Sequence, residues 1–390
     1  MTTIDINTQR SAVRQLAESL DIPPSAYKLA VERYDAMSRH LERDESAVAK
    51  YRPYIYPQGS FQLGTVVPPH DPKHGYDLDL ACEMRELTKT EMTQEKLKQL
   101  VGDEVKAYAS KYGMHEPTEK PRCWHLDYQD PKAHFHMDIV PSVPEDEATK
   151  RRLATLVLPA NVHFVESAVG ITDKNNANYR VISSDWRRSN PRGYAAWFKS
   201  RMRTVAVRLM EARADVRKAD EVPAYEWKTP LQVAVQIIKQ HRNAMFRDDL
   251  DNAPPSCIIT TLAGLAYEGQ LDERDALMAI VQGMPKFIRS AVPFVANPVN
   301  PEEDFADKWT TKPGRRKHYD RWYAHLVRDL DQLGAPMTAD QITEQFGQKF
   351  GVSLPGDKAK KLATKLSVPA SVAAPSLLIA SKPPPWAARG

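Results

Sequence analysis

One short alternating segment constrains the fold of this chain more than any other feature. Residues 76–80 read Tyr-Asp-Leu-Asp-Leu, so Asp77 and Asp79 fall on one face of an extended strand and apolar side chains on the other. Two carboxylates on one face repel each other unless a cation lies between them. Because the donors are all oxygen atoms, the pattern favours a hard ion such as Mg²⁺.

A β-hairpin is predicted over residues 124–140, with arms at 124–128 and 134–140 and a turn at 130–132. One face of the second arm carries three polar side chains, His134, His136 and Asp138. If this arm pairs beside the first strand, three carboxylates converge. That arrangement suits a two-metal phosphoryl-transfer site, in which the ions lie roughly 3.5–4 Å apart.

Each motif has an ordinary interpretation when it is taken alone. Surface strands often carry alternating acids, and most Gly-Ser pairs, such as Gly59-Ser60, are simple turns. His134 and His136 have the spacing of metal ligands, but two such histidines are more often hydrogen-bonded or exposed. The combination is more specific than its parts, because a Gly-Ser turn, an Asp-x-Asp strand and a later Asp on an apolar strand follow in order.

These motifs resemble the DNA polymerase β-like nucleotidyltransferase superfamily. Within it they are most similar to the bacterial cGAS/DncV-like nucleotidyltransferases (CD-NTases) of CBASS anti-phage operons. The similar phrases are Gln-Gly-Ser-Phe-Gln-Leu-Gly-Thr, Tyr-Asp-Leu-Asp-Leu and Phe-His-Met-Asp-Ile-Val-Pro. Residues 189–198 and 231–242 are similar to two later helices of that family, so the resemblance extends over roughly residues 10–350.

The resemblance implies an α+β fold. It comprises a polymerase β-like nucleotidyltransferase core, which is a mixed sheet with helices, and a helical C-terminal lobe, both braced by N-terminal helices. The expected divisions are N-terminal helices at 1–50, the catalytic core at 51–190, the helical lobe at 191–366 and a flexible tail at 367–390.

The resemblance also implies roles for particular residues. The catalytic acids, which would also hold two Mg²⁺ ions with Mn²⁺ as a substitute, are Asp77, Asp79 and Asp138. The residues expected to contact the nucleotide and its phosphates are Gln58, Gly59, Ser60 and Lys239. Ser60 would offer a hydroxyl, and the Gly59 turn would present backbone N–H groups at close range.

The expected activity is the joining of nucleoside triphosphates (NTPs) into a cyclic di- or trinucleotide, with release of pyrophosphate, as a signal in anti-phage defence. One alternative is a linear oligonucleotide synthase or an enzyme that modifies RNA or protein. A second, from another class, is an inactive scaffold on the same fold. The choice of bases and of 2′–5′ or 3′–5′ linkages depends on pocket side chains that the sequence does not place.

The bulk properties set limits on these expectations. The net charge of +4 is too small to argue for nucleic-acid binding by itself. The three cysteines have no metal or disulfide spacing, and Cys82 is expected to pack as a small apolar residue. This cysteine usage, the absence of a signal pattern and the absence of a membrane-length apolar run lead us to expect a cytoplasmic protein.

The pattern along the chain predicts the secondary structure in outline. Helices are expected over 8–50, broken at Pro23-Pro24, and over about 90–112. A strand is expected from 157 to 165. Asn190 is a good N-cap for a helix that begins at Pro191. From there to about residue 365 the pattern is helical, with proline-rich breaks at 221–230, 253–256 and 293–301.

Three features bear on partners. The free tail ending in Gly390 suits conjugation by an E1/E2-like ligase, because many CD-NTases are encoded beside one; an ordinary flexible terminus is the alternative. The product would activate a separate effector protein. A basic run is either a solvated face or a contact for nucleotide phosphates, an intermediate or an activating polyanion. It comprises Arg187, Arg188, Arg192, Lys199, Arg201, Arg203 and Arg208. A nucleic acid or a protein is the expected kind of activator. Core packing is the default for the aromatic residues nearby, which are Tyr179, Trp186 and Tyr194.

Overall fold

The computed structural model describes residues 5–69, 75–129, 134–211 and 228–367. Its centre is a seven-stranded mixed sheet in which the main path runs β1-β2-β5-β4-β3, while β6 pairs with the end of β5 and β7 pairs with β6. The strands are β1 Pro53–Gln58, β2 Tyr76–Met84, β3 Thr118–Glu119, β4 Trp124–Gln129, β5 His134–Pro144, β6 Val169–Ile171 and β7 Arg187–Ser189. The predicted hairpin is confirmed as β4 and β5; its turn lies outside the described residues.

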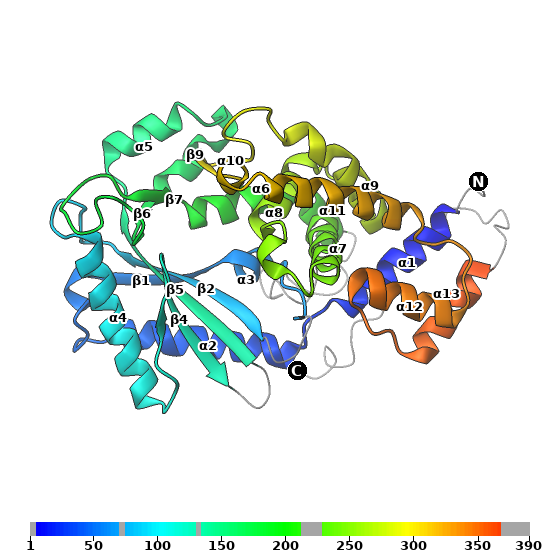
Figure 1. Ribbon diagram of the computed structural model, residues 1–390, viewed down its shortest axis with the longest axis horizontal. Helices are drawn as coiled ribbons and strands as arrows, with labels where there is room; N and C mark the ends of the chain where they lie inside the picture. The colour runs from blue at the N-terminus through cyan, green and yellow to red at the C-terminus, as the bar shows by residue number, and fades with distance from the viewer. Residues whose placement is uncertain (1–4, 70–74, 130–133, 212–227, 368–390) are drawn as a thin grey trace.

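Most of the helices gather on one side of the molecule, away from the sheet (Figure 1). The longer ones are α1 Ile6–Ser19, α2 Pro24–Glu42, α4 Gln94–Lys111, α6 Pro191–Glu211, α7 Pro230–Met245, α8 Ser256–Ala266, α9 Glu273–Gly283, α11 Gly314–Asp331, α12 Ala339–Phe350 and α13 Gly356–Ser367. Short helices are α3 Gly59–Leu63, α5 Glu147–Ala154, α10 Lys308–Thr311 and the 3-10 turns η1 Ala49–Tyr51, η3 Pro159–Ser167, η5 Leu250–Asn252 and η6 Met284–Phe287. The predicted α+β architecture, with a mixed sheet and a helical C-terminal region, is therefore confirmed.

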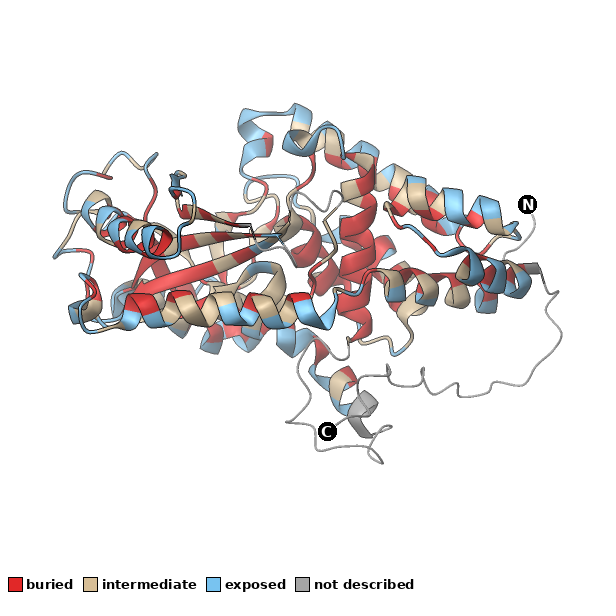
Figure 2. Ribbon diagram, turned by 90° about the horizontal axis from the view of Figure 1, so that it is seen from below, coloured by how far each residue is buried: buried red, intermediate tan, exposed pale blue. Residues whose placement is uncertain are grey.

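Two large apolar clusters hold these layers together. One lies between the sheet and helices α2 and α4, and it includes Cys82, which packs as an apolar residue as expected. The other joins α1 to the helices from α6 onward and centres on α7, which is buried along most of its length. Figure 2 shows this buried material as red strands and red central helices. The four-part division of the chain stays a prediction.

The N-terminal brace consists of two helices that contact different parts of the molecule. Helix α1 packs against α7, α9 and α13, whereas α2 packs against β1, β2 and α4. The break falls at Pro23-Pro24 as predicted, and α2 starts with Pro24 at its first position. The second helix ends at Glu42, short of the predicted residue 50.

Two other segment predictions are wrong or incomplete. The sequence predicts a strand over residues 157–165, but the 3-10 helix η3 Pro159–Ser167 occupies this stretch. Pro159 has no N–H for a sheet ladder, and burial of Phe164 and Val165 as neighbours does not follow the period of two that a strand requires. The proline-rich break at 293–301 contains part of a small hairpin, β8 Ala296–Asn297 and β9 Asn300–Asp304.

The start of α6 follows the prediction closely. Asn190 Oδ1 accepts a hydrogen bond of 3.0 Å from the backbone N–H of Gly193, three residues on, with Pro191 at the first helical position. Among the helices that the structure describes, we find none that is both long and apolar enough to span a bilayer.

Candidate active site

The parallel pairing of β2 with β5 brings the predicted acids together. Asp79 is the register partner of Asp138, and Asp77 is the partner of His136. The neighbouring antiparallel pair places Gln58, the last residue of β1, opposite Asp79. The condition set by the sequence, that the second hairpin arm pairs beside the Asp-x-Asp strand, is therefore met, and all three carboxylates lie in one part of the sheet.

The charge around Asp79 is poorly compensated in the protein alone. Its pKa is raised to about 7, first by burial and then by the negative charges of Asp77 and Asp138. Lys239 and Lys120 act in the opposite direction but do not offset these effects. A carboxylate held among like charges in this way is typical of a cation-binding or catalytic site.

Gly59 makes close contact with this carboxylate. It follows β1 directly and begins α3, with a φ of +64°. A Cβ built on Gly59 would lie 2.1 Å from Asp79 Oδ2. Both the positive φ and the approach of the carboxylate therefore require glycine here. Ser60 comes next in the chain, and it lines the same cavity.

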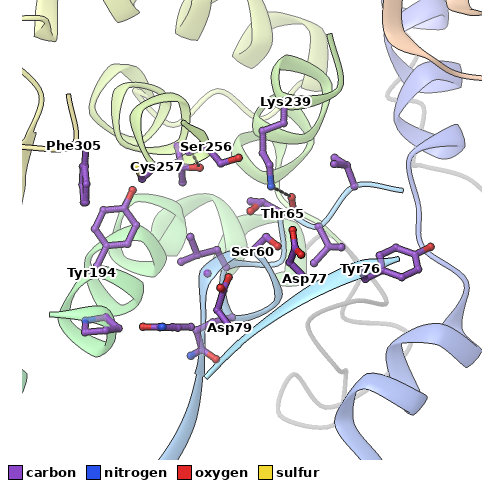
Figure 3. Close-up of a pocket in the computed structure, with 18 of the residues that line it drawn as sticks. Ser60, Thr65, Tyr76, Asp77, Asp79, Tyr194, Lys239, Ser256, Cys257 and Phe305 are labelled. Carbon is purple, nitrogen blue, oxygen red and sulfur yellow. Dashed lines mark hydrogen bonds between the residues drawn. The ribbon is translucent and has the colours of Figure 1, made fainter. Parts of the chain in front are cut away.

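Lys239 reaches this region from α7, on the opposite wall. It is only 4% exposed, and its Nζ donates a 2.8 Å hydrogen bond to the carbonyl of Thr65. Burial lowers the pKa of Lys239 to about 7, with the charge of Arg242 acting in the same direction. Figure 3 shows Lys239 directed toward Thr65, with Ser60 and Asp77 nearby.

Two glutamines on α7 contact the same segment of chain. Gln232 Nε2 donates a 3.0 Å hydrogen bond to the carbonyl of Leu63, and Gln236 Nε2 donates one to the carbonyl of Val66. Together with Lys239, these side chains lie four and then three residues apart, which places them on one face of the helix. Helix α7 therefore fixes the loop that follows the Gly-Ser turn. The family resemblance indicated Lys239 but neither of the glutamines.

A cavity of about 770 Å³ connects these groups. The predicted residues that line it are Gln58, Gly59, Ser60, Asp77, Asp79 and Lys239. Its wall continues away from the acids to Tyr194, Cys257 and Phe305, which Figure 3 shows on the opposite side of the opening from Tyr76. This volume is in the range of small-molecule and cofactor pockets.

Asp138 is not among the cavity-lining residues, and its carboxylate is held from the other side. Asp138 Oδ1 contacts Nδ1 of His125 at 2.6 Å and Nζ of Lys120 at 3.2 Å. His125 is the register partner of Asp138 across the hairpin. The sequence pattern indicated neither neighbour. The predicted arms, 124–128 and 134–140, would pair His125 with Met137, whereas the observed register is shifted by one residue and pairs it with Asp138.

A second polar group lies on the same hairpin. His125, Asp127 and His136 offer ligand atoms that all lie within 4.8 Å of one another, close enough to surround a metal ion. The contacts are also explained without an ion, because Asp127 Oδ1 lies within hydrogen-bond distance of Nδ1 of His136 and 3.2 Å from Nε2 of His125. His134, which the sequence paired with His136, is exposed and outside this group.

Much of the basic run is used within the molecule. Arg187 and Arg188 pair with Asp307 and Glu302, and Arg192 lies 3.5 Å from Glu83. The guanidinium of Arg201 donates to two backbone carbonyls, and Lys199 and Arg203 are exposed. The side chain of Arg208 lies outside the described residues. These contacts argue against one continuous basic face.

The aromatic residues near this run have different environments. Tyr179 and Trp186 are buried, as core packing requires. Tyr194 instead lines the cavity, and its hydroxyl is 2.8 Å from Thr261 Oγ1. Gly390 and the rest of the predicted tail from residue 368 onward lie outside the described residues.

Comparisons with known proteins place this geometry in a family. Residues 53–141, which contain the Gly-Ser turn and all three acids, match the model described as "Cyclic GMP-AMP synthase DncV-like, nucleotidyltransferase domain". A c-di-GMP synthase from Roseivirga ehrenbergii is 31% identical over 338 residues, covering 85% of this chain and 81% of that protein. The chain belongs to the CD-NTase family.

Other CD-NTases agree with this assignment. The cyclic dinucleotide synthase CdnG of Bradyrhizobium diazoefficiens is 26% identical over 354 residues, covering 86% of this chain and 78% of CdnG. A solved structure of CdnG in complex with GTP superposes with a TM-score of 0.64 at 23% identity, covering 92% of this chain and 98% of that one. A Vibrio cholerae DncV structure has a TM-score of 0.53 at 16% identity, with 90% of each chain covered. At these identities the structures support the fold of this CD-NTase.

Proposed function

We propose that this CD-NTase joins nucleoside triphosphates into a cyclic dinucleotide and releases pyrophosphate. The observation that carries the proposal is the pairing of Asp79 with Asp138, beside the cavity that Asp79 shares with the buried Lys239. The synthase names of the Roseivirga and Bradyrhizobium relatives support the same reaction class.

The residues present fit a pair of divalent cations. The predicted ligand atoms are carboxylate oxygens, and the pKa of Asp79 is raised by burial and by the neighbouring charges of Asp77 and Asp138, which the protein does not offset. When bound, Mg²⁺ or Mn²⁺ would neutralise phosphate charge and lower the pKa of the attacking hydroxyl. Asp77 and Asp79 would hold the ion nearer the triphosphate, and Asp138 would complete the second site.

The remaining groups would bind and position the nucleotide. The Ser60 hydroxyl is available to donate to a phosphate oxygen, and the absence of a side chain at Gly59 leaves room for Asp79 beside it. Lys239 would donate to the triphosphate in its protonated form, which the negative charge of bound phosphates favours. Catalysis on this view is positioning and charge neutralisation for an in-line displacement.

The direct test incubates the purified protein with all four NTPs and Mg²⁺ and identifies products by mass spectrometry. We expect a product that survives phosphatase treatment, as a ring without terminal phosphates does. A phosphatase-sensitive product would favour the linear alternative, and labelling of added RNA or protein would favour a modifying enzyme. Nucleotide binding without turnover in every condition would favour the scaffold alternative.

We further propose a setting in anti-phage defence, in which the product activates a separate effector. The tail ending in Gly390 would be the site of conjugation by an E1/E2-like ligase. Removing Gly390 should abolish conjugation and leave nucleotide synthesis intact. Conjugation of the truncated chain would exclude Gly390 as the site of conjugation. A structural neighbour from Escherichia coli, CdnC, was solved in complex with HORMA, which supports a protein partner for this chain.

A further inference from the structure

The end of the cavity away from the acids contains a carboxylate that the proposed chemistry does not use. Glu303 lies on β9 and lines the cavity together with Tyr194, Cys257 and Phe305. With the triphosphate held by the acids and Lys239, this end is where the base of a bound nucleotide would lie.

The acids on either side of Glu303 have clear structural roles. Glu302 pairs with Arg152 and Arg188, and Asp304 accepts backbone N–H groups from the segment around Phe294. Strand alternation puts Glu303 on the opposite face from both, toward the cavity.

The charge of Glu303 is only partly offset by its neighbours, which include Asn297 and the charges of Arg187 and Arg122. Its carboxylate accepts a 2.8 Å hydrogen bond from Asn297 Nδ2, and no ion pair to it is found among the residues that the structure describes. Burial raises the pKa of this carboxyl above its usual range. A half-buried carboxylate whose charge is only partly offset is costly, and groups of this kind are concentrated at binding sites. The hydrogen bond from Asn297 also fixes the direction in which Glu303 points.

Two aromatic rings lie at the same end. Tyr194 and Phe305 meet edge to face, with ring centroids 5.8 Å apart and an interplanar angle of 89°. The hydrogen bond between the Tyr194 hydroxyl and Thr261 restricts the ring of Tyr194. The end of the cavity thus offers aromatic surface for a base and a carboxylate that can read its edge.

We infer that Glu303 recognises guanine, and so makes GTP the preferred nucleotide of this cavity; the inference rests on the proposed function. Guanine is the common base whose Watson–Crick edge presents two adjacent donors, the N1–H and the N2 amino group. A carboxylate accepts both at once, in a charge-assisted bidentate pair. Adenine offers an acceptor at N1 instead, which would face a carboxylate oxygen and repel it.

The test measures competition of GTP, ATP and inosine triphosphate (ITP) for the cavity, using a fluorescent GTP analogue as the displaced probe. Wild-type protein should bind GTP at least about fivefold more tightly than ATP, since a good bidentate pair contributes about 1–3 kcal/mol of discrimination. ITP lacks the N2 amino group, so it should bind more weakly than GTP. Equal binding of ITP and GTP to the wild-type protein would overturn the inference without any variant.

Glu303→Gln provides the second measurement. A glutamine presents one acceptor and one donor, which matches the edge of adenine, so the GTP-to-ATP preference should fall at least about fivefold. The matched control is Glu302→Gln on the same strand, which should leave the preference unchanged. A preference that survives Glu303→Gln contradicts the inference. If the Glu303→Gln variant still prefers GTP and cyclic product forms, the assignment of Glu303 to guanine fails but the proposed synthesis stands. If the preference for GTP depends on Glu303 but no cyclic product forms, the proposed synthesis fails but the assignment of Glu303 stands.

Discussion

Asp79 of β2 and Asp138 of β5 are register partners in a parallel strand pair, although they lie far apart in the chain. A parallel pair requires a crossover, and here the crossover contains α4. The two carboxylates are close enough for the charge of Asp138 to raise the pKa of Asp79. This pair is therefore the firmest structural basis for a cation-dependent reaction.

Replacing Asp138 should remove catalysis while the fold persists. Asp138→Asn keeps the shape of the side chain but removes one carboxylate charge, and loss of several kcal/mol of transition-state stabilisation lowers turnover by about a hundredfold or more. Product formation from NTPs measures the effect, and circular dichroism checks the fold. Asp103→Asn, at an exposed position on α4, is the control and should keep full activity. Wild-type turnover by Asp138→Asn would exclude a catalytic role.

A methyl group at Gly59 should block the site. Gly59→Ala puts a Cβ 2.1 Å from Asp79 Oδ2, which forces the carboxylate to move. The positive φ by itself costs about 1–2 kcal/mol for an L-residue. Gly113→Ala separates the two effects, because Gly113 has a φ of +63° and nothing within 4 Å of its added Cβ. We expect comparable strain in both variants by thermal unfolding but loss of turnover only in Gly59→Ala. Equal turnover in both would mean that the approach to Asp79 is unimportant.

Cation binding to the nucleotide-free protein should strengthen as the pH rises through about 7. The pKa of Asp79 is raised to about 7, so below that pH its carboxyl is protonated and is a poor ligand. Mn²⁺ binding followed by electron paramagnetic resonance between about pH 5.5 and 8.5 measures this change. In Asp79→Asn the rise near pH 7 should disappear, and a rise that persists would assign it to another group.

The raised pKa of Asp79 also makes the free energy of unfolding depend on pH. A folded-state pKa above the unfolded value of 3.8 means that the folded protein binds the extra proton between about pH 4 and 7. The contribution of Asp79 to the free energy of unfolding is therefore lost as pH rises through about 7. Asp79→Asn should therefore gain more stability relative to the wild type at about pH 8 than at about pH 5, because the contribution is lost progressively from about pH 4 to about pH 7. The buried Lys239 acts in the opposite direction, since its lowered pKa makes stability recover as pH rises above about 7. Urea unfolding at the two pH values measures the difference.

Loss of a glutamine on α7 should loosen the loop after the Gly-Ser turn. Gln236→Leu leaves the buried carbonyl of Val66 without its donor, which costs about 1–3 kcal/mol. We expect a lower melting temperature together with a raised KM for NTP, because Thr65 and Lys239 lie next to this contact. Gln348→Leu, on the exposed face of α12, is the control and should change neither quantity. A raised KM without any loss of stability would instead indicate direct contact between Gln236 and substrate.

Strand alternation made the acidic residues predictable. Which face a side chain occupies depends only on the period of two, so the sequence alone assigns Asp77, Asp79 and Asp138 to their faces. The helix break at Pro23-Pro24 and the helix start at Pro191 followed from proline geometry in the same way. The error at 157–165 came from a short apolar run, in which local pattern does not distinguish a strand from a tight helix.

What the sequence by itself determined about this protein is therefore its local chemistry: a Gly-Ser turn, three acids on apolar strands and a basic helix residue at Lys239. Only the tertiary structure decided which distant groups meet. It placed His125 and Lys120 against Asp138, two glutamines of α7 on the loop after Ser60, and Glu303 in the same cavity as Asp79. The physical reason is that these contacts, and the pKa shifts that burial causes, depend on the packing of segments far apart in the chain, which no local pattern specifies.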